Sequence, residues 1–188
     1  MILPKSFYAR SPLRVAPDLL GKEIVRQTSF GRVGGIITEV EAYRGHLDPA
    51  SHAFRGATPR NEVMFGDGGV AYVYFIYGMY FCLNVVTGTA GTASAVLIRA
   101  LVPATGKKLL FERIPAEKVA SCMSGPGKLC NVLEVDRRLN GKSFRGPEIT
   151  LYDRRIRVPK KEIFKTPRIG IKVGTDKLWR FVWERDAE

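Results

Sequence analysis

Short apolar runs and alternating segments dominate the hydrophobic pattern of this chain. They predict strands at residues 23–27, 36–43, 94–101, 149–152, 168–173 and 179–183. Helices are expected to be short, one at 17–20 ended by Gly21 and one within 103–118, and the glycines at 31–35 predict a turn. No repeat recurs at a fixed period. The pattern predicts an α+β fold, a mixed domain with a curved, mainly antiparallel sheet flanked by short helices.

The aromatic run from Tyr72 to Leu83 is the most apolar part of the chain, and Gly78 stands near its centre. A glycine between two strand-like halves predicts a protruding β-hairpin. The loop before it, from His46 to Gly69, is long enough to indicate a functional segment.

Alternation places Ile37, Glu39, Glu41 and Tyr43 on one face of the predicted strand 36–43. Arg99 interrupts another apolar strand, so it either meets an anion or faces solvent at an edge. Glu39 and Glu41 are candidate partners of Arg99. Because they share a face of the strand, the two carboxylates are expected to have the same charge and similar burial, and to differ only in their position along the strand.

Composition favours one folded unit, expected to span residues 1–188. The chain has 188 residues, is 45% hydrophobic and 26% charged, and is long enough to bury a sizeable core. Its formal net charge of +12 favours a polyanionic partner, either nucleic acid or an anionic membrane surface. A basic surface that only keeps the protein solvated is the alternative.

Targeting and metal signals are weak. The first ten residues lack the apolar stretch of a secretory signal, and the near-apolar run 70–86 is too short to span a bilayer. We expect a protein that is not in a membrane, cytoplasmic in a bacterium or nuclear in a eukaryote. Three cysteines and two histidines argue against a disulfide framework or a zinc site, while a carboxylate-only magnesium site stays open.

Several motifs together resemble the alkyladenine (3-methyladenine) DNA glycosylase family. They are Glu39-Val40-Glu41-Ala42-Tyr43, His52, Thr58-Pro59-Arg60-Asn61, the aromatic run continued to Asn84, Leu97-Ile98-Arg99-Ala100-Leu101 and Ser124-Gly125-Pro126-Gly127-Lys128-Leu129-Cys130. These blocks stand in the family's order and extend from about Phe7 to Phe181.

The resemblance implies the chemistry of a monofunctional glycosylase. Glu41 would be the general base that activates a water, and Arg99 would help to position that water. Tyr43 and His52 would sandwich a flipped base, and Tyr74 would complete the pocket. A carboxylate suits this reaction independently, because breaking an N-glycosidic bond builds positive charge on the sugar.

The same resemblance implies contacts with DNA. Asn84 would lie near the exocyclic position of the purine and disfavour normal guanine. Tyr77 would enter the minor groove and fill the vacated stack, with Met79 wedged beside the lesion. Arg60 and Lys128 would lie near phosphates.

Each assignment has a structural alternative. His52 is otherwise a loop histidine bonded to backbone, and Asn84 a turn or strand-end residue. For Tyr72 and Phe75, ordinary sheet packing is the favoured interpretation.

The expected partner is double-stranded DNA that contains a damaged purine: 3-methyladenine, 7-methylguanine, or also hypoxanthine or ethenoadenine. Hydrolysis would leave an abasic site, without metal or organic cofactor and in a monomer. Two other functions stay open, a non-catalytic nucleic-acid-binding module and a magnesium-dependent nuclease that uses Glu39, Glu41 and Asp48.

Overall fold

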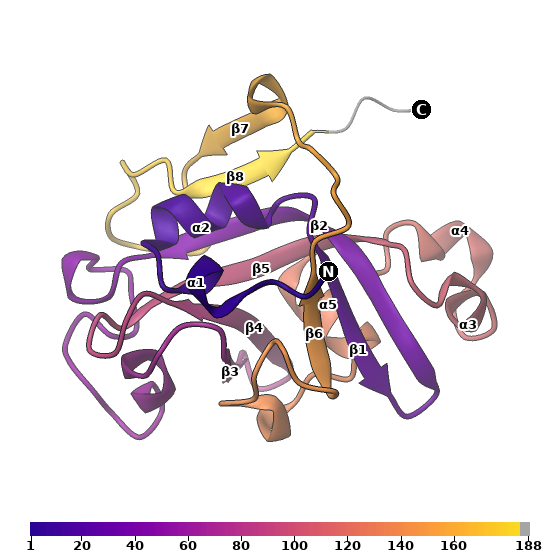
Figure 1. Ribbon diagram of the computed structural model, residues 1–188, viewed down its shortest axis with the longest axis horizontal. Helices are drawn as coiled ribbons and strands as arrows, with labels where there is room; N and C mark the ends of the chain where they lie inside the picture. Colours follow the sequence, from indigo (N-terminus) through magenta and orange to yellow (C-terminus); the bar gives the residue numbers. More distant parts are fainter. Residues whose placement is uncertain (185–188) are drawn as a thin grey trace.

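An eight-stranded sheet forms the centre of the computed structural model, which describes residues 1–184 (Figure 1). The strands are β1 Glu23–Thr28, β2 Gly31–Tyr43, β3 Ala71–Ile76, β4 Tyr80–Thr87, β5 Ser94–Pro103, β6 Ile149–Tyr152, β7 Ile163–Thr166 and β8 Arg180–Trp183. The α-helices are α1 Lys5–Tyr8, α2 Pro12–Leu19, α3 Lys107–Phe111, α4 Ala116–Val119 and α5 Pro126–Val132. Single 3-10 turns are η1 Gly45–Leu47, η2 Glu62–Phe65, η3 Arg137–Leu139 and η4 Lys160–Glu162.

Strand β2 organises the sheet. The order is β3-β4-β5-β2-β1-β6, and β8 joins β2 and β7, with every strand pair antiparallel. The first half of β2 pairs with β1 and its second half with β8, while β5 pairs with residues 35–43 of β2. The predicted α+β fold with a mainly antiparallel sheet is confirmed.

A register shift interrupts the pairing of β2 with β5. Ile37 faces Leu101, but Glu39 faces Ala100 and Val40 faces Ile98. The shift resets the alternation, so Ile37 is buried in the same apolar core as Val40. The prediction that Ile37 shares a face with Glu39, Glu41 and Tyr43 was therefore wrong for Ile37.

Helices cover both faces of the sheet. Helix α2 packs on β2 and β5 in front of the sheet, and α5 packs on β4 and β5 behind it (Figure 1). Helix α2 begins earlier than the predicted 17–20, because the Ser11 hydroxyl accepts a hydrogen bond from the Leu13 amide and Pro12 suits the first helical position. Helices α1 and α5 had no clear sequence signal.

The long loop 46–69 is ordered by a small core of its own. Ala53 and Met64 from the loop are buried against Tyr72, Val86 and Ala95 of the sheet. Such a satellite cluster holds a long loop in one conformation, as a functional loop requires.

Two predicted segments differ in the structure because of proline and glycine. The single helix expected within 103–118 is two short helices, α3 and α4, separated at Pro115, which cannot continue a helix from its N-terminal side. The glycines at 31–35 do not form a turn but begin β2, and the turn lies at Ser29 and Phe30. A Cβ on Gly34 would lie 2.3 Å from the Ile24 carbonyl oxygen, so the glycine permits close strand approach.

The predicted strand 168–173 is also wrong, because this segment is an irregular loop. Gly170 has a φ of 78°, outside the range of a strand. The hairpin prediction is confirmed by β3 and β4, and the strand expected at 179–183 is found as β8. One domain over 1–188 stays a prediction, and residues 185–188 lie outside the described part.

The close approach at Gly34 predicts a stability effect. We expect Gly34→Ala to lower the free energy of unfolding by about 1–3 kcal/mol, because the added methyl group must push β1 and β2 apart. Gly66→Ala is the control, since its added Cβ would meet nothing closer than 3.6 Å at a negative φ. Urea unfolding of both variants measures the difference, and equal stabilities would contradict the steric explanation.

Candidate active site

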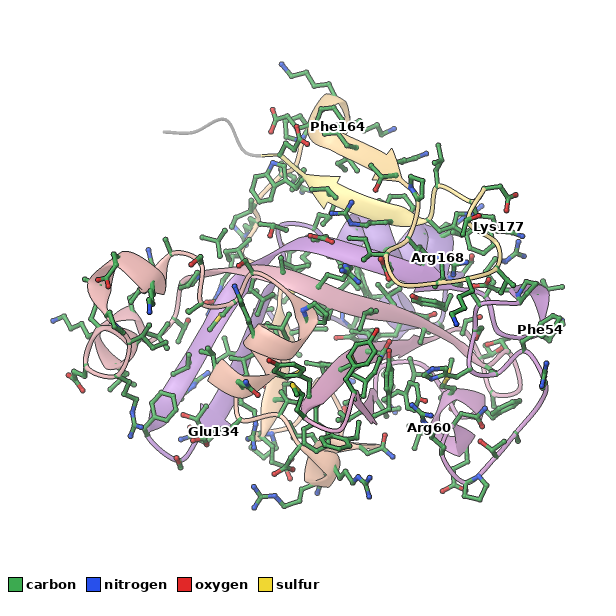
Figure 2. All side chains as sticks on the ribbon, turned by 180° about the vertical axis from the view of Figure 1, so that it is seen from behind. Phe54, Arg60, Glu134, Phe164, Arg168 and Lys177 are labelled. Carbon is green, nitrogen blue, oxygen red and sulfur yellow. The ribbon has the colours of Figure 1, made fainter. Side chains whose placement is uncertain are left out.

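A cleft of ≈ 690 Å³ opens on the side of the sheet that carries α5. Its walls come from residues 49–52, from β3, β4 and β5, from residues 124–128 and from the loop 169–173. Figure 2 shows the molecule from behind, with Arg168 labelled on the loop that leads to β8 and Arg60 labelled on the long loop. Residues from the motifs at 39–43, 72–84, 97–101 and 124–130 therefore meet His52 at one cavity, whereas the motif at 58–61 does not line it.

Glu41 and Arg99 form an ion pair at the base of the cleft. Arg99 Nη1 lies 3.2 Å from Glu41 Oε1, and Arg99 Nε donates a hydrogen bond to Glu39 Oε1 at 2.7 Å. Burial alone would lower the pKa of Arg99, but Glu41 and Glu39 raise it above its ordinary value. Of the two alternatives for Arg99, the structure therefore supports the anion partner.

The Glu41 carboxylate is fixed by two further donors. The Ile169 amide donates to Oε1 at 2.8 Å, and the Tyr43 hydroxyl donates to Oε2 at 2.8 Å. Burial, then the charge of Glu41, raises the pKa of Tyr43 far above its ordinary range, so this hydroxyl stays protonated. Glu41 is fully buried, and the cleft is lined by Tyr43 and Arg99 in front of it.

Glu39 differs from Glu41 more than alternation predicted. Its side chain is 18% exposed, against 0% for Glu41, and it binds Arg180 at 2.6 Å in addition to Arg99. Burial acts to raise the pKa of Glu39, but hydrogen bonds from Arg180 and Arg99 hold it below its ordinary value. The expectation of matched burial was wrong, because β8 and Arg180 cover Glu39 only in part.

Aromatic side chains line the cleft, among them those for which a base pocket was predicted. His52 packs edge-on against Tyr74, with ring centroids 4.6 Å apart, and Tyr74 lies 5.4 Å from Tyr72. Tyr43 lines the same cleft next to Glu41. The structure thus brings Tyr43, His52 and Tyr74 to one cavity.

Tyr72 combines sheet packing with a contact to the site. It is buried in the small core, as the favoured interpretation required, and its hydroxyl lies 2.9 Å from His52 Nδ1. Burial raises the pKa of Tyr72 to about 12, whereas desolvation and the charge of Arg60 lower the pKa of His52. A neutral imidazole held by a protonated phenol is the favoured state.

Asn84 lies in β4 within the wall of the cleft. It is buried, and its amide nitrogen donates to the Tyr72 carbonyl at 3.1 Å. That bond fixes the orientation of the amide and leaves the oxygen as the remaining acceptor toward the cavity.

The hairpin tip projects two large side chains. Tyr77 is 77% exposed and Met79 is 63% exposed. Tyr77 has a φ of 54° and Gly78 of 68°, the left-handed pair that a tight hairpin turn requires. An aromatic residue in this conformation is uncommon and marks a position with a possible role beyond packing.

Arg60 and Lys128 lie at two rims of the site. The Arg60 guanidinium lies 5.4 Å from the Tyr74 ring centroid, on the exposed long loop. Lys128 is exposed in the first turn of α5 and lines the cleft. Both cations are exposed, and whether they contact phosphates stays a prediction.

Several residues that support the site had no sequence prediction. The Ile169 amide is a backbone donor, which leaves no mark in side-chain type. Asn61 fixes the His52 loop by donating to the His52 carbonyl at 2.8 Å and accepting from the Thr58 amide at 2.7 Å. Arg168 is buried and paired with Asp48. The signal that could have found it is an arginine at the start of an apolar run, similar to Arg99 within one.

The nuclease alternative does not fit these pairings. Asp48 binds Arg168, and Glu39 binds two arginines, so both carboxylates are already neutralised. Across residues 1–184, no group of three or more His, Cys, Asp or Glu side chains is arranged to hold a metal ion. None of the helices in the same range has the length and apolar character to cross a bilayer.

Comparison with known proteins identifies the family. The family model of methylpurine-DNA glycosylase matches residues 6–187. The chain belongs to this family. The enzyme is therefore a DNA glycosylase, a hydrolase that acts in DNA repair, and the alternatives of a non-catalytic module and a nuclease were wrong.

Curated relatives of the chain agree with this family assignment. A Rhodopseudomonas palustris protein is 49% identical over 179 residues, which cover 95% of this chain and 86% of that protein. A protein from Carboxydothermus hydrogenoformans is 47% identical, and the match covers 96% of this chain and 94% of that protein. A protein from Methanocella arvoryzae is 48% identical, and the match covers 96% of this chain and 91% of that protein. All three carry the name of a 3-methyladenine DNA glycosylase. The predicted resemblance is confirmed.

The left-handed conformation of Tyr77 at the hairpin tip predicts an effect on stability and an effect on DNA binding. Asparagine adopts the left-handed conformation readily, so we expect Tyr77→Asn to raise the free energy of unfolding by about 0.5–1 kcal/mol. The same change should weaken binding to a lesion duplex, because the exposed ring is lost. Urea unfolding and duplex titration measure the two effects.

Tyr77→Ala is the matched control, since it removes the ring but keeps a side chain that disfavours this φ. It should weaken lesion binding without the gain in stability. A loss of stability in Tyr77→Asn would show instead that the ring is packed, and unchanged lesion binding in both variants would remove the tip from DNA recognition.

Proposed function

We propose that this glycosylase flips alkylated or deaminated purines out of duplex DNA and hydrolyses their N-glycosidic bond with a water activated by Glu41. 3-Methyladenine and 7-methylguanine are the proposed cationic substrates, with hypoxanthine and ethenoadenine as neutral ones. The product is an abasic site. The observation that supports this most is a fully buried carboxylate, bound by two hydrogen-bond donors and paired with Arg99, behind the wall of an aromatic cleft.

The contacts of Glu41 suit a general base. An ionised carboxylate has about four acceptor positions; Ile169 and Tyr43 donate to two of them, and the Arg99 guanidinium lies 3.2 Å from Oε1. The remaining position can accept a hydrogen bond from one water that enters through the cleft. Two hydrogen-bond donors and one guanidinium therefore surround the carboxylate that is proposed to accept the proton.

The chemical step then balances without a metal. The water oxygen attacks the anomeric carbon, its proton passes to Glu41, and the electrons of the broken bond leave with the purine. Negative charge beside the sugar stabilises its developing positive charge. A cationic alkylpurine departs as a neutral base, whereas a neutral purine needs a proton from an acid that the described residues do not identify.

The cleft walls support recognition of a flipped base. Tyr43 and His52 are proposed to stack on the purine, Tyr74 to close the pocket, and Asn84 to meet the purine edge. A base extruded from the duplex loses stacking worth a few kcal/mol, and aromatic walls replace part of it. The neutral state of His52 avoids repulsion of a cationic base.

The hairpin tip and the basic rim support a duplex partner. Tyr77 is proposed to fill the gap left by the flipped base, with Met79 beside it, as inserted side chains do in minor-groove binders. Arg60 and Lys128 would bind phosphates beside the lesion. A single chain carries all these parts, so a monomer is the proposed active form.

The direct test is release of a free base. The enzyme is incubated with a duplex that contains one 7-methylguanine or one hypoxanthine, with excess chelator present. Release of the modified base and an alkali-labile abasic site are expected for the cationic lesion. Strand cutting without base release, or loss of release on chelation, would contradict the proposal.

Glu41→Gln tests the catalytic step. We expect single-turnover base release to fall by about 100- to 10,000-fold, since the amide cannot accept the water's proton, while lesion-duplex affinity persists. Glu39→Gln should cost much less, because Arg99 keeps its bond to Glu41. Since Glu39 is less buried, Glu23→Gln supplies the control for burial, at a carboxylate that is 3% exposed and bonded to Arg154 outside the cleft.

Equal losses in all three variants would show that lost charge only weakens the fold. Release near the wild-type rate in Glu41→Gln would overturn the role of Glu41, and loss of lesion binding would make it a structural residue.

The lowered pKa of His52 predicts a pH dependence of base binding. Desolvation and the charge of Arg60 lower the pKa of His52 and so favour the neutral ring. The ring is therefore neutral above the ordinary imidazole pKa, and it gains a proton as pH falls through the lowered pKa of the folded protein. In a Glu41→Gln background, the affinity ratio of a 7-methylguanine duplex to undamaged duplex should be constant at neutral pH and fall in acid. Fluorescence titration measures this ratio.

His52→Gln in the same background should abolish the fall in acid. An unchanged fall would assign the pH dependence to another group, and a ratio that rises in acid would contradict the sign of the effect.

A further inference from the structure

A buried ion pair lies directly behind the cleft. Arg168 binds Asp48 through two nitrogens, at 2.5 Å and 2.9 Å, and both side chains are fully buried. Removing two charges from water is costly, and a well-packed apolar pair of similar volume often stabilises a fold as well or better. The pair therefore invites an explanation beyond stability.

Arg168 connects the two segments that hold Glu41. Its Nη1 also donates to the Ala42 carbonyl at 3.0 Å, between Glu41 and Tyr43 in β2. The next residue in the chain is Ile169, whose amide donates to Glu41. Figure 2 shows Arg168 pointing from the loop before β8 toward the body of the protein. One side chain thus fixes the loop that supplies a donor to the proposed base.

Arg168 also sets the plane of the proposed stacking ring. Its guanidinium carbon lies 4.6 Å from the Tyr43 ring centroid and 5.1 Å from that of Trp179. Tyr43 lines the cleft and Arg168 does not, so the guanidinium covers the ring from behind. A planar guanidinium can stack on rings and bind a carboxylate through two nitrogens at once, which a lysine cannot do.

Asp48 extends the same connection to the turn before His52. Its carboxylate accepts hydrogen bonds from the amides of Arg44 at 3.3 Å and Ala50 at 3.2 Å. These amides bracket the turn that leads from Tyr43 toward His52. The ion pair therefore joins β2, the turn before His52 and the loop 168–173.

We propose that Arg168 and Asp48 are positioning residues that set the Tyr43 ring, the Ile169 amide and the His52 turn relative to Glu41. The inference rests on the proposed roles of Glu41 and Tyr43. Neither residue of the pair touches the base. Their effect is on the geometry of the bound complex, where a displacement of about 1 Å can slow a reaction by about 100-fold.

The experiment removes the pair without leaving a buried charge. Arg168→Met combined with Asp48→Asn keeps similar volumes, and asparagine can still accept from the Ala50 amide. The control, Arg154→Met with Glu23→Gln, removes a pair with a buried carboxylate between β1 and the segment after β6. Single-turnover release of 7-methylguanine is measured well below both unfolding midpoints, together with affinity for undamaged duplex.

We expect the Arg168 and Asp48 double variant to release base at least about tenfold more slowly, with unchanged affinity for undamaged duplex. The control double variant should keep close to the wild-type rate. Equal slowing in both, or the wild-type rate in the first, would overturn the proposal.

Arg168→Lys keeps the test decisive if the double variant does not fold, since it retains a cation beside Asp48 but loses the planar, two-nitrogen geometry. A reduced release rate is expected, and a wild-type rate would overturn the proposal. Glu41→Gln is assayed in parallel. Wild-type release in that variant would refute the proposed function, whereas a dead Glu41→Gln beside fully active Arg168 variants would refute the positioning role alone.

Discussion

The register shift between β2 and β5 is the constraint on which the site depends. Regular pairing would leave Arg99 as one more residue of an apolar strand, but the shift leaves it out of the ladder, where it reaches both Glu39 and Glu41. Irregularities of this kind re-aim side chains next to active sites. Because β2 also pairs with β1 and β8, its path is fixed from both sides, and the carboxylates inherit that rigidity.

The fixed position of the Glu41 carboxylate contrasts with the exposure of the hairpin tip. The Glu41 carboxylate is held by bonds from β5, from its own strand and from the loop before β8. Such a network is strong in a low-dielectric interior when every member is satisfied. The tip that carries Tyr77 and Met79 has no comparable packing and is free to meet a partner of variable shape. In the proposed mechanism, the chemical step and the capture of the base therefore belong to parts of the molecule with different packing.

The sequence predicted those elements that a short stretch of neighbouring residues determines. Alternation gave the face of Glu41 and Tyr43, and Gly78 marked the hairpin. It was wrong for Ile37 and for the strand at 168–173, because a register shift and a glycine-bent loop are decided by tertiary partners. The Ile169 amide could not be predicted, since a backbone donor carries no side-chain signature. The resemblance supplied His52 and Asn84, for which local pattern alone favoured structural roles.

Charge balance in the interior explains how a basic protein can receive a cationic base. The chain carries a formal net charge of +12, which would repel a positively charged purine if it extended into the cleft. Around the proposed general base Glu41, however, three arginines are paired with three carboxylates. The arginines are Arg99, Arg168 and Arg180, and the carboxylates are Glu39, Glu41 and Asp48. The lowered pKa of His52 adds no charge at neutral pH. Lys128 and Lys172 also line the cleft, but both are exposed, so water and salt screen their charge from the entering lesion.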